Sequence, residues 1–211
     1  MISVYTVNKN TDIKWIKQCV EALSGQTFRK FEYIFLDYGS DNVEDLHYML
    51  IDMLGDIDFK FIQIDKDKDF SFIDAIRVAI DHCGFESVLR ADADDIMRPE
   101  CLKRLIMNSL ENHIVYSDYY VINEDNKPIG VNTHNRFLPA HALIRKSIYD
   151  LVRYLPGQQF RDGTSLEIAI RNNDEINVKH VKERLFFYRQ HTNSLTSNKE
   201  LVEKTDKEIN A

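Results

Sequence analysis

Short apolar runs alternate with stretches of helical spacing over the first 110 residues, and this alternation restricts the fold more than any other feature. The apolar runs predict strands over 2–7, 32–36, 59–64 and 87–91. The segments between them place apolar residues at three- and four-residue steps, which predicts helices over 13–23, 46–53 and 71–81. Because helices of about 10 to 15 residues separate the strands, they form βαβ units. The sequence therefore predicts a Rossmann-like α/β domain with a mostly parallel central sheet flanked by helices.

The second half of the chain is less regular. We expect strands over 113–123 and 129–133, a short helix over 166–171, and further strands over 176–181 and 184–189. Pro99 is expected to open a helix, since the first helical position needs no N–H group. The stretch 198–211 is polar and charged, which predicts a surface helix or a frayed tail.

Composition narrows the class of protein. The 211 residues, 44% hydrophobic and 29% charged, are typical of one soluble globular domain. A net charge of -7 without a basic run argues against nucleic acid and against an anionic membrane surface. Cys19, Cys83 and Cys101 form no CxxC pair, which predicts reduced thiols packed in the core. With no signal peptide and no apolar stretch of about 18 residues, we expect a cytoplasmic protein without a membrane span.

The strongest local signal is an acidic turn directly after the fourth predicted strand. Asp92, Asp94 and Asp95 lie within four residues, so their carboxylates repel one another unless a cation or hydrogen bonds compensate. Mg²⁺ or Mn²⁺ bound there would bridge to a diphosphate, because such ions take one or two carboxylates plus phosphate oxygens. The alternative is a solvated turn in which Asp95 caps the next helix.

Other polar residues also lie at or just after predicted strand ends, namely Thr6, Asn8, Asp37 and Asp65. Ligands of parallel sheets bind at the carboxyl ends of strands, where the strand order reverses. Residues 65–69 are not a calcium loop, because Phe70 stands where glycine is needed and Ile76 where a bidentate glutamate is needed. We expect a solvated loop there, in which Asp65 alone contacts a base or ribose.

Glycine-rich phosphate loops are absent from the sequence. Its seven glycines form no G-x-G-x-x-G, Walker A or G-x-S-x-G motif, which argues against dinucleotide dehydrogenases, P-loop kinases and α/β-hydrolases. A diphosphate would therefore have to be held by a metal and by side chains.

These features together resemble the glycosyltransferases of family 2, which have the GT-A fold. Residues 26–34 resemble the family's "QTxxxxEYI" junction, 36–40 its "DDGS" loop and 72–80 its "DAxNxGI" helix. The acidic turn with Pro99 resembles "DxDDxxxP", residues 160–162 the acceptor-side "ED" pair and 188–196 the "YRxHxxSxT" segment. The opening 4–10 is similar to the first strand and its turn, so the matches run in order from residue 2 to about 197.

The resemblance implies a metal-dependent enzyme that moves a sugar from a nucleoside diphosphate, with UDP-sugars such as UDP-glucose favoured, to a hydroxyl of a glycan or glycoconjugate. Mn²⁺ or Mg²⁺ would be held by Asp94, with His191 and Asp92 as further ligands. Asp162 would be the general base of an inverting transfer. The implied donor-binding residues are Thr6, Asn8, Asp37 at the nucleotide base, Asp65, Arg77, Asp92 at the ribose, and Ala93.

The resemblance also implies a domain organisation. Residues 1–110 would form the nucleotide-sugar-binding half and 111–197 the acceptor-side half of one domain. Two organisations stay open: the chain is a minimal enzyme, or it is the N-terminal domain of a longer polypeptide, in which residues 198–211 would lead to further carbohydrate-active domains.

Four positions depart from the family pattern. Tyr38 replaces the second aspartate of the "DDGS" loop, so the contacts to the base differ. Arg77 replaces the asparagine of "DAxNxGI", where it can pair with a phosphate, and Ala79 replaces the glycine. Arg161 stands in place of the acid that precedes the base.

Several alternatives stay open at the level of sequence. His191 can be a loop histidine bonded to backbone, and Asp162 a helix N-cap. Trp15 and Tyr188 fit the core better than a sugar-stacking role, and Arg189 is a phosphate ligand or a surface ion-pair partner. A sugar nucleotidyltransferase would need a glycine-rich loop after the first strand, which is missing. A non-catalytic module derived from a glycosyltransferase remains the other alternative.

Overall fold

The part of the chain that the structure describes contains nine named strands, five named α-helices and one 3-10 helix. The computed structural model describes residues 1–41, 43–65, 70–132, 139–155, 158, 160–192, 194, 203, 205, 207 and 209. In chain order the elements are β1 (Ile2–Asn8), α1 (Ile13–Ser24), β2 (Phe31–Tyr38), α2 (Val43–Leu54), β3 (Asp58–Ile64), α3 (Phe72–Asp81), β4 (Ser87–Arg90), β5 (Ile96–Met97), α4 (Cys101–Met107), β6 (Ile114–Ile122), β7 (Pro128–Asn132), β8 (Leu143–Arg145), η1 (Lys146–Leu151), α5 (Asp162–Arg171) and β9 (Val178–Arg189).

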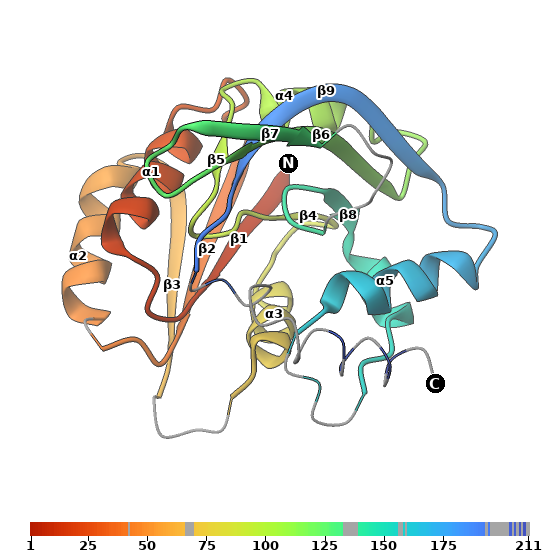
Figure 1. The fold of residues 1–211 in the computed structure, drawn as a ribbon, viewed down its shortest axis with the longest axis horizontal. Helices are drawn as coiled ribbons and strands as arrows, with labels where there is room; N and C mark the ends of the chain where they lie inside the picture. The colour runs from red at the N-terminus through yellow and green to blue at the C-terminus, as the bar shows by residue number, and fades with distance from the viewer. Residues whose placement is uncertain are drawn as a thin grey trace.

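The strands form one sheet in the order β3-β2-β1-β4-β8-β6-β9-β5, with β7 paired to β6 (Figure 1). The four strands expected from the first half of the chain lie side by side and run parallel. Beyond them β8 is antiparallel to β4 and β6, whereas β9 runs parallel to β6. The expected α/β class with a parallel central sheet is confirmed.

Both faces of the parallel strands are covered, because alternate residues of each strand point to opposite sides. Val4 and Phe35 pack in one buried cluster with α1, α2 and α4, and Tyr5 and Ile34 pack in another with α3. Helices α1 and α3 begin where the sequence predicts, whereas α2 begins at Val43, three residues before the expected start. Asp12 accepts a hydrogen bond from the N–H of Lys14 at the start of α1, and Ser71 forms a capping box with Asp74 at the start of α3.

The structure differs from expectation at several places from β5 onward. The helix expected over 166–171, α5, begins four residues earlier, at Asp162. The two strands expected over 176–181 and 184–189 are one twelve-residue strand, β9. Its register against β6 shifts on either side of Asp118, so that Val181 pairs with Ser117 and Arg184 with Asp118. Residues 182, 183 and 185 of β9 therefore have no partner on β6, and these bulges interrupt the apolar pattern. The helix expected at Pro99 begins at Cys101, and the short β5, β8 and η1 were not expected.

Two expectations fall at the edge of what the structure describes. Residue 133, the expected end of β7, lies outside the described residues, as does most of the expected helix or tail over 198–211. Positions 203, 205, 207 and 209 are described, and all four are helical.

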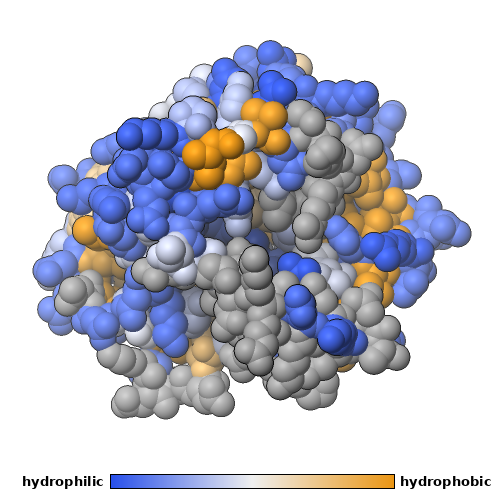
Figure 2. Space-filling view, viewed as in Figure 1, coloured by the Kyte–Doolittle hydropathy of each residue, from blue (hydrophilic) through white to orange (hydrophobic). Residues whose placement is uncertain are grey.

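The face drawn in Figure 2 is mainly hydrophilic, with one apolar area over β6 and β7 and another at the right edge, on the side of α5. Ile129 and Val131 of β7 are exposed in the first of these areas. The three cysteines are free and buried, as expected. Within the described part of the chain, no helix is long and apolar enough to span a bilayer.

Candidate active site

A cavity of about 610 Å³ opens at the carboxyl ends of β1 and β4. The chain leaves β1 for β2 on one side and returns to β4 on the other, so the strand order reverses between β1 and β4. This is the edge at which open α/β sheets bind ligands. The cavity lining comes mainly from segments far apart in sequence, which are residues 9–12, 14, 15, 38, 72, 90, 92–94, 160–164, 188, 191, 192 and 194.

The acidic turn divides its carboxylates between the cavity and the interior. Asp92, Ala93 and Asp94 line the cavity, whereas Asp95 points inward and is 1% exposed. Asp95 accepts a hydrogen bond from the backbone N–H of Arg189 at 2.8 Å, and its other oxygen lies 3.2 Å from Nε2 of His141. The alternative in which Asp95 caps the next helix is therefore wrong: β5 follows the turn, and Asp95 instead ties the turn to the end of β9.

Burial changes the pKa values of the carboxyl groups in this turn and of the neighbouring His141. Burial raises the pKa of Asp92 to about 6, against the opposing effect of the Arg90 guanidinium. Burial likewise raises the pKa of Asp95 and lowers that of His141 to about 4. The turn thus carries more negative charge than its surroundings readily stabilise, so a cation brought by a ligand would be favoured there.

Arg90, the last residue of β4, lies between two of the expected functional carboxylates. Its Nε is 2.7 Å from Oδ1 of Asp92, and its Nη1 donates to Oδ2 of Asp162 at 2.6 Å. Asp162 is the first residue of α5, and the residue in the N-cap position is Arg161, at φ 70°. The alternative in which Asp162 is the N-cap is therefore wrong, and its carboxylate reaches the cavity and Arg90.

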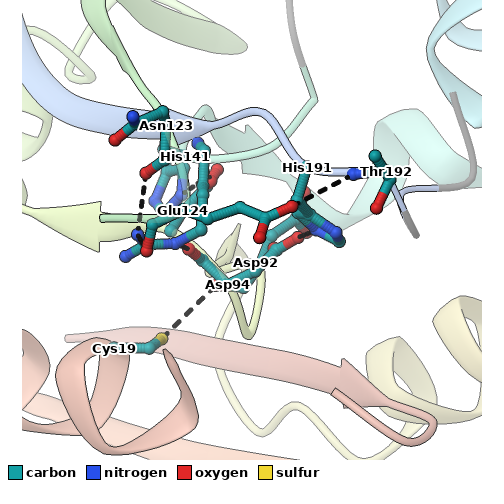
Figure 3. Close-up of polar contacts among 10 residues, drawn as sticks. Cys19, Asp92, Asp94, Asn123, Glu124, His141, His191 and Thr192 are labelled. Atoms are coloured by element: carbon teal, nitrogen blue, oxygen red, sulfur yellow. Dashed lines mark hydrogen bonds and ion pairs between the residues drawn. The ribbon is translucent and has the colours of Figure 1, made fainter. Parts of the chain in front are cut away.

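Asp94 and His191 meet on the cavity wall. Oδ2 of Asp94 lies 2.8 Å from Nε2 of His191, and the imidazole ring lies 4.5 Å from the ring of Trp15, centroid to centroid. In Figure 3 the acidic turn lies between Cys19 of α1 and the hairpin residues Asn123 and Glu124. The cysteine Sγ is 3.4 Å from the main-chain oxygen of Asp92, so α1 supports the turn from below.

Asp94 and His191 are groups of the kind that bind divalent metals, and they are hydrogen-bonded to each other. Two neighbouring ligands of an octahedral Mg²⁺ or Mn²⁺, each at about 2.1 Å, are about 3 Å apart, close to the 2.8 Å found here. The described residues contain no cluster of three or more His, Cys, Asp or Glu that could hold a metal. The remaining ligands would therefore have to be phosphate oxygens and water, as is usual for Mg²⁺ at nucleotides.

Arg189 is a residue whose place the sequence did not reveal. It is 1% exposed, and neither a surface ion pair nor a free phosphate ligand. Its Nε donates to the main-chain oxygen of Asp94, its Nη1 to Oδ1 of Asn126 and its Nη2 to Oε1 of Gln18. Arg189 therefore ties the acidic turn to the β6–β7 hairpin and to α1.

Three expected donor-binding residues lie beneath the cavity rather than on its lining. Thr6 is buried and donates to the main-chain oxygen of Ala91. Asn8 donates to Oδ2 of Asp37, and both are buried. Oδ1 of Asp37 accepts hydrogen bonds from the N–H groups of Gly39 and Ser40. These side chains shape the loops after β1 and β2.

The remaining expected residues fall into two groups. Asp65 is exposed and is not among the residues that line the cavity, and Arg77 is exposed beside a smaller cleft of about 440 Å³ between α3 and η1. Tyr38, Trp15 and Tyr188 line the main cavity. Trp15 is also buried, at 6% exposure, and Tyr188 packs against the core, which agrees with the core placement expected for these two residues.

Comparison with solved structures shows the fold. S. aureus TarS, residues 1–349 in complex with UDP-GlcNAc, is similar with a TM-score of 0.73 at 15% identity, over 99% of this chain and 65% of that one. The mannosyltransferase PcManGT from Pyrobaculum calidifontis, in complex with GDP-Man and Mn²⁺, is similar with a TM-score of 0.64 at 11% identity, over 88% of this chain and 56% of that one. The chain thus spans less than two thirds of the length of either neighbour, and both support the expected GT-A fold.

Comparison of sequences identifies the family. No curated protein matches the chain. The family model described as glycosyl transferase family 2 matches residues 3–189, which include β1, the acidic turn, Asp162 and Arg189. The chain therefore belongs to glycosyl transferase family 2.

Proposed function

We propose that this domain transfers a sugar from a metal-bound nucleoside diphosphate to an acceptor hydroxyl. The observation that carries the proposal is one cavity, at the strand-order reversal, lined by Asp94, His191 and Asp162. Six of its lining residues are Asp or Glu and four are Lys or Arg. A diphosphate would be repelled by such a lining unless a divalent cation accompanied it.

Asp94 and His191 are the proposed metal ligands, with Asp92 as a further ligand or as the ribose contact. A bound Mn²⁺ or Mg²⁺ would offset the negative charge that grows on the departing diphosphate. Trp15 packs on His191 and so restricts the orientation of the imidazole. Thr6, Asn8 and Asp37 contribute to the donor site through the loops that they hold, while roles for Asp65 and Arg77 stay predictions.

Asp162 is the proposed general base. The acceptor oxygen bonds to the anomeric carbon as the bond from that carbon to the diphosphate oxygen breaks. The acceptor proton passes to Asp162, and the electron pair leaves with the nucleoside diphosphate. Attack from the face opposite the leaving group inverts the anomeric configuration.

We propose a UDP-sugar donor and a glycan or glycoconjugate acceptor, with the acceptor approaching from the side of α5. TarS, a neighbour that covers 99% of this chain, was solved with UDP-GlcNAc. PcManGT was solved with GDP-Man, so GDP belongs in the same experiment as the competing nucleotide.

Calorimetric titration with UDP, UDP-glucose and GDP, with and without Mn²⁺, tests the donor site. We expect UDP binding that requires Mn²⁺, that is lost in Asp94→Ala and that is unchanged in Asp52→Ala, which alters an exposed residue of α2. Binding to no nucleotide, or binding indifferent to Mn²⁺ and to Asp94, would contradict the proposal and favour a non-catalytic module.

A further inference from the structure

Arg90 contacts both the acidic turn, through Asp92, and the proposed base, Asp162. Its side chain is 6% exposed at the carboxyl end of β4, and it lines the cavity between Asp92 and Asp162. Asp92 follows it by two residues, whereas Asp162 comes from α5, 72 residues later. One buried guanidinium therefore joins the donor side of the cavity to the acceptor side.

The orientation of this guanidinium is fixed on several sides. Nε contacts Asp92 and Nη1 contacts Asp162, so the two carboxylates occupy different edges of one planar group. The ring of Phe72 lies 5.2 Å from the guanidinium carbon and covers its face. A planar fork with several donors can hold two carboxylates in a set relation, which the single ammonium of lysine cannot do.

Asp162 depends on Arg90 for its position. Within the described part of the chain, Arg90 is the one side chain that is hydrogen-bonded to the Asp162 carboxylate. The contact engages Oδ2, which leaves Oδ1 to receive a proton. The hydroxyls of Tyr5 and Tyr149 lie 3.5 Å apart in the same buried region. Burial raises the pKa of each, so both are neutral at ordinary pH and, unlike Arg90, bring no positive charge to the carboxylate.

We propose that Arg90 is a positioning residue for sugar transfer, which holds the Asp162 carboxylate in a set relation to Asp92 and thus to the donor. This inference rests on the proposed function. In this role Arg90 makes no contact with a reacting atom and acts through Asp162. Its loss therefore lowers kcat only as long as Asp162 is present as a base.

A double-mutant cycle on kcat tests this dependence, with wild-type transfer as the reference. Arg90→Gln is expected to lower kcat about 100-fold or more, and Arg90→Lys, which keeps the charge but not the fork, to lower it less. In the Asp162→Asn background, Arg90→Gln is expected to change kcat less than about threefold. The control Arg29→Gln, at an exposed pair with Asp56, leaves kcat unchanged.

Two results would overturn the role of Arg90 while leaving the proposed function intact. One is an Arg90→Gln enzyme with kcat within about threefold of wild type, and the other is an equal loss in the wild-type and Asp162→Asn backgrounds, as expected for a purely structural residue. Because Arg90→Gln leaves two buried carboxylates without their partner, folding is checked by thermal unfolding. If Arg90→Gln does not fold, Arg90→Lys replaces it in the double-mutant cycle. An unchanged kcat, or an equal loss of kcat in the two backgrounds, would then overturn the role of Arg90.

Discussion

Arg189 donates a hydrogen bond of 2.7 Å from Nε to the main-chain oxygen of Asp94, across 95 residues of sequence. The same side chain bonds Asn126 of the hairpin and Gln18 of α1, and its guanidinium carbon lies 5.3 Å from the ring of Trp15. The position of Asp94 is thus determined by β9, α1 and the hairpin together. This relation explains how Asp94, one of the two proposed metal ligands, can keep a set position on its turn.

Arg189→Met is expected to lower stability by about 2 kcal/mol, because it leaves several partly buried acceptors, including the Asp94 carbonyl, without a donor. Urea unfolding followed by circular dichroism measures this change. The control is Arg104→Met, which removes an exposed ion pair with Glu183 and is expected to cost less than about 1 kcal/mol. Equal midpoints for the two variants would contradict the structural role of Arg189.

His191→Ala is expected to weaken Mn²⁺-dependent nucleotide binding about 10- to 100-fold, since it removes one of the two protein groups on the proposed metal. Nucleotide binding without metal should change little. Thr192→Ala at the adjacent cavity-lining position is the control. Calorimetry with and without Mn²⁺ separates a loss of metal binding from a loss of a direct nucleotide contact. A loss of the same size without metal would show that His191 contacts the nucleotide and not the metal.

The first half of the fold could be predicted because its elements are local and regular. Strands of the parallel core and the helices between them each carry their own apolar period, so β1 to β4 were predicted to within a few residues. β5 and β8, with two and three residues, are too short to show a period. β9 was divided in two because a bulge, which depends on its partner β6, interrupts the alternation.

The residues of the candidate site also fall into those that the sequence could predict and those that it could not. Asp92, Asp94 and His191 belong to short motifs, and the structure does bring them to one cavity. Arg90 and Arg189 were visible as letters of those motifs, but apart from Asp92 the partners of these two arginines are 63 to 171 residues away in sequence. Arginine is mostly exposed in proteins, so nothing in the sequence favoured a buried place for either. An arginine that ends an apolar strand, as Arg90 does, is the one signal that could have been used.

Asp162→Asn is expected to lower kcat about 10²- to 10⁴-fold, the range usual for loss of a general base, while the affinity for the nucleotide and Mn²⁺ changes less than about threefold. Asparagine keeps the shape and can still face Arg90, so the effect separates basicity from packing. Glu167→Gln, at another acid that lines the cavity from α5, is the control. Steady-state transfer rates and calorimetry measure the two quantities. A loss of nucleotide affinity with unchanged kcat would assign Asp162 to the donor instead.

Glu32 provides a test of the fold that does not involve the cavity. It is 4% exposed on β2, where it accepts hydrogen bonds from the Ser3 hydroxyl at 2.6 Å, from Lys60 at 2.9 Å and from the N–H of Gly84. Burial alone would raise the pKa of this carboxyl, but the hydrogen bonds from Ser3, Lys60 and Gly84 outweigh burial and hold it below its usual value of 4.5. The folded protein therefore binds the proton of Glu32 at a lower pH than the unfolded chain does.

Stability from Glu32 is thus fully present above about pH 4.5 and is lost as the pH falls through the lower pKa of the folded state. Glu32→Gln removes this contribution at every pH, so the difference in stability between wild type and variant should shrink from about pH 7 to about pH 3. Urea unfolding at several pH values measures it, with Glu21→Gln, an exposed residue of α1, as the control. Lys60 is half exposed, so part of the effect should also weaken with salt. A difference that stayed constant with pH would show that Glu32 contributes by packing and not by its charge.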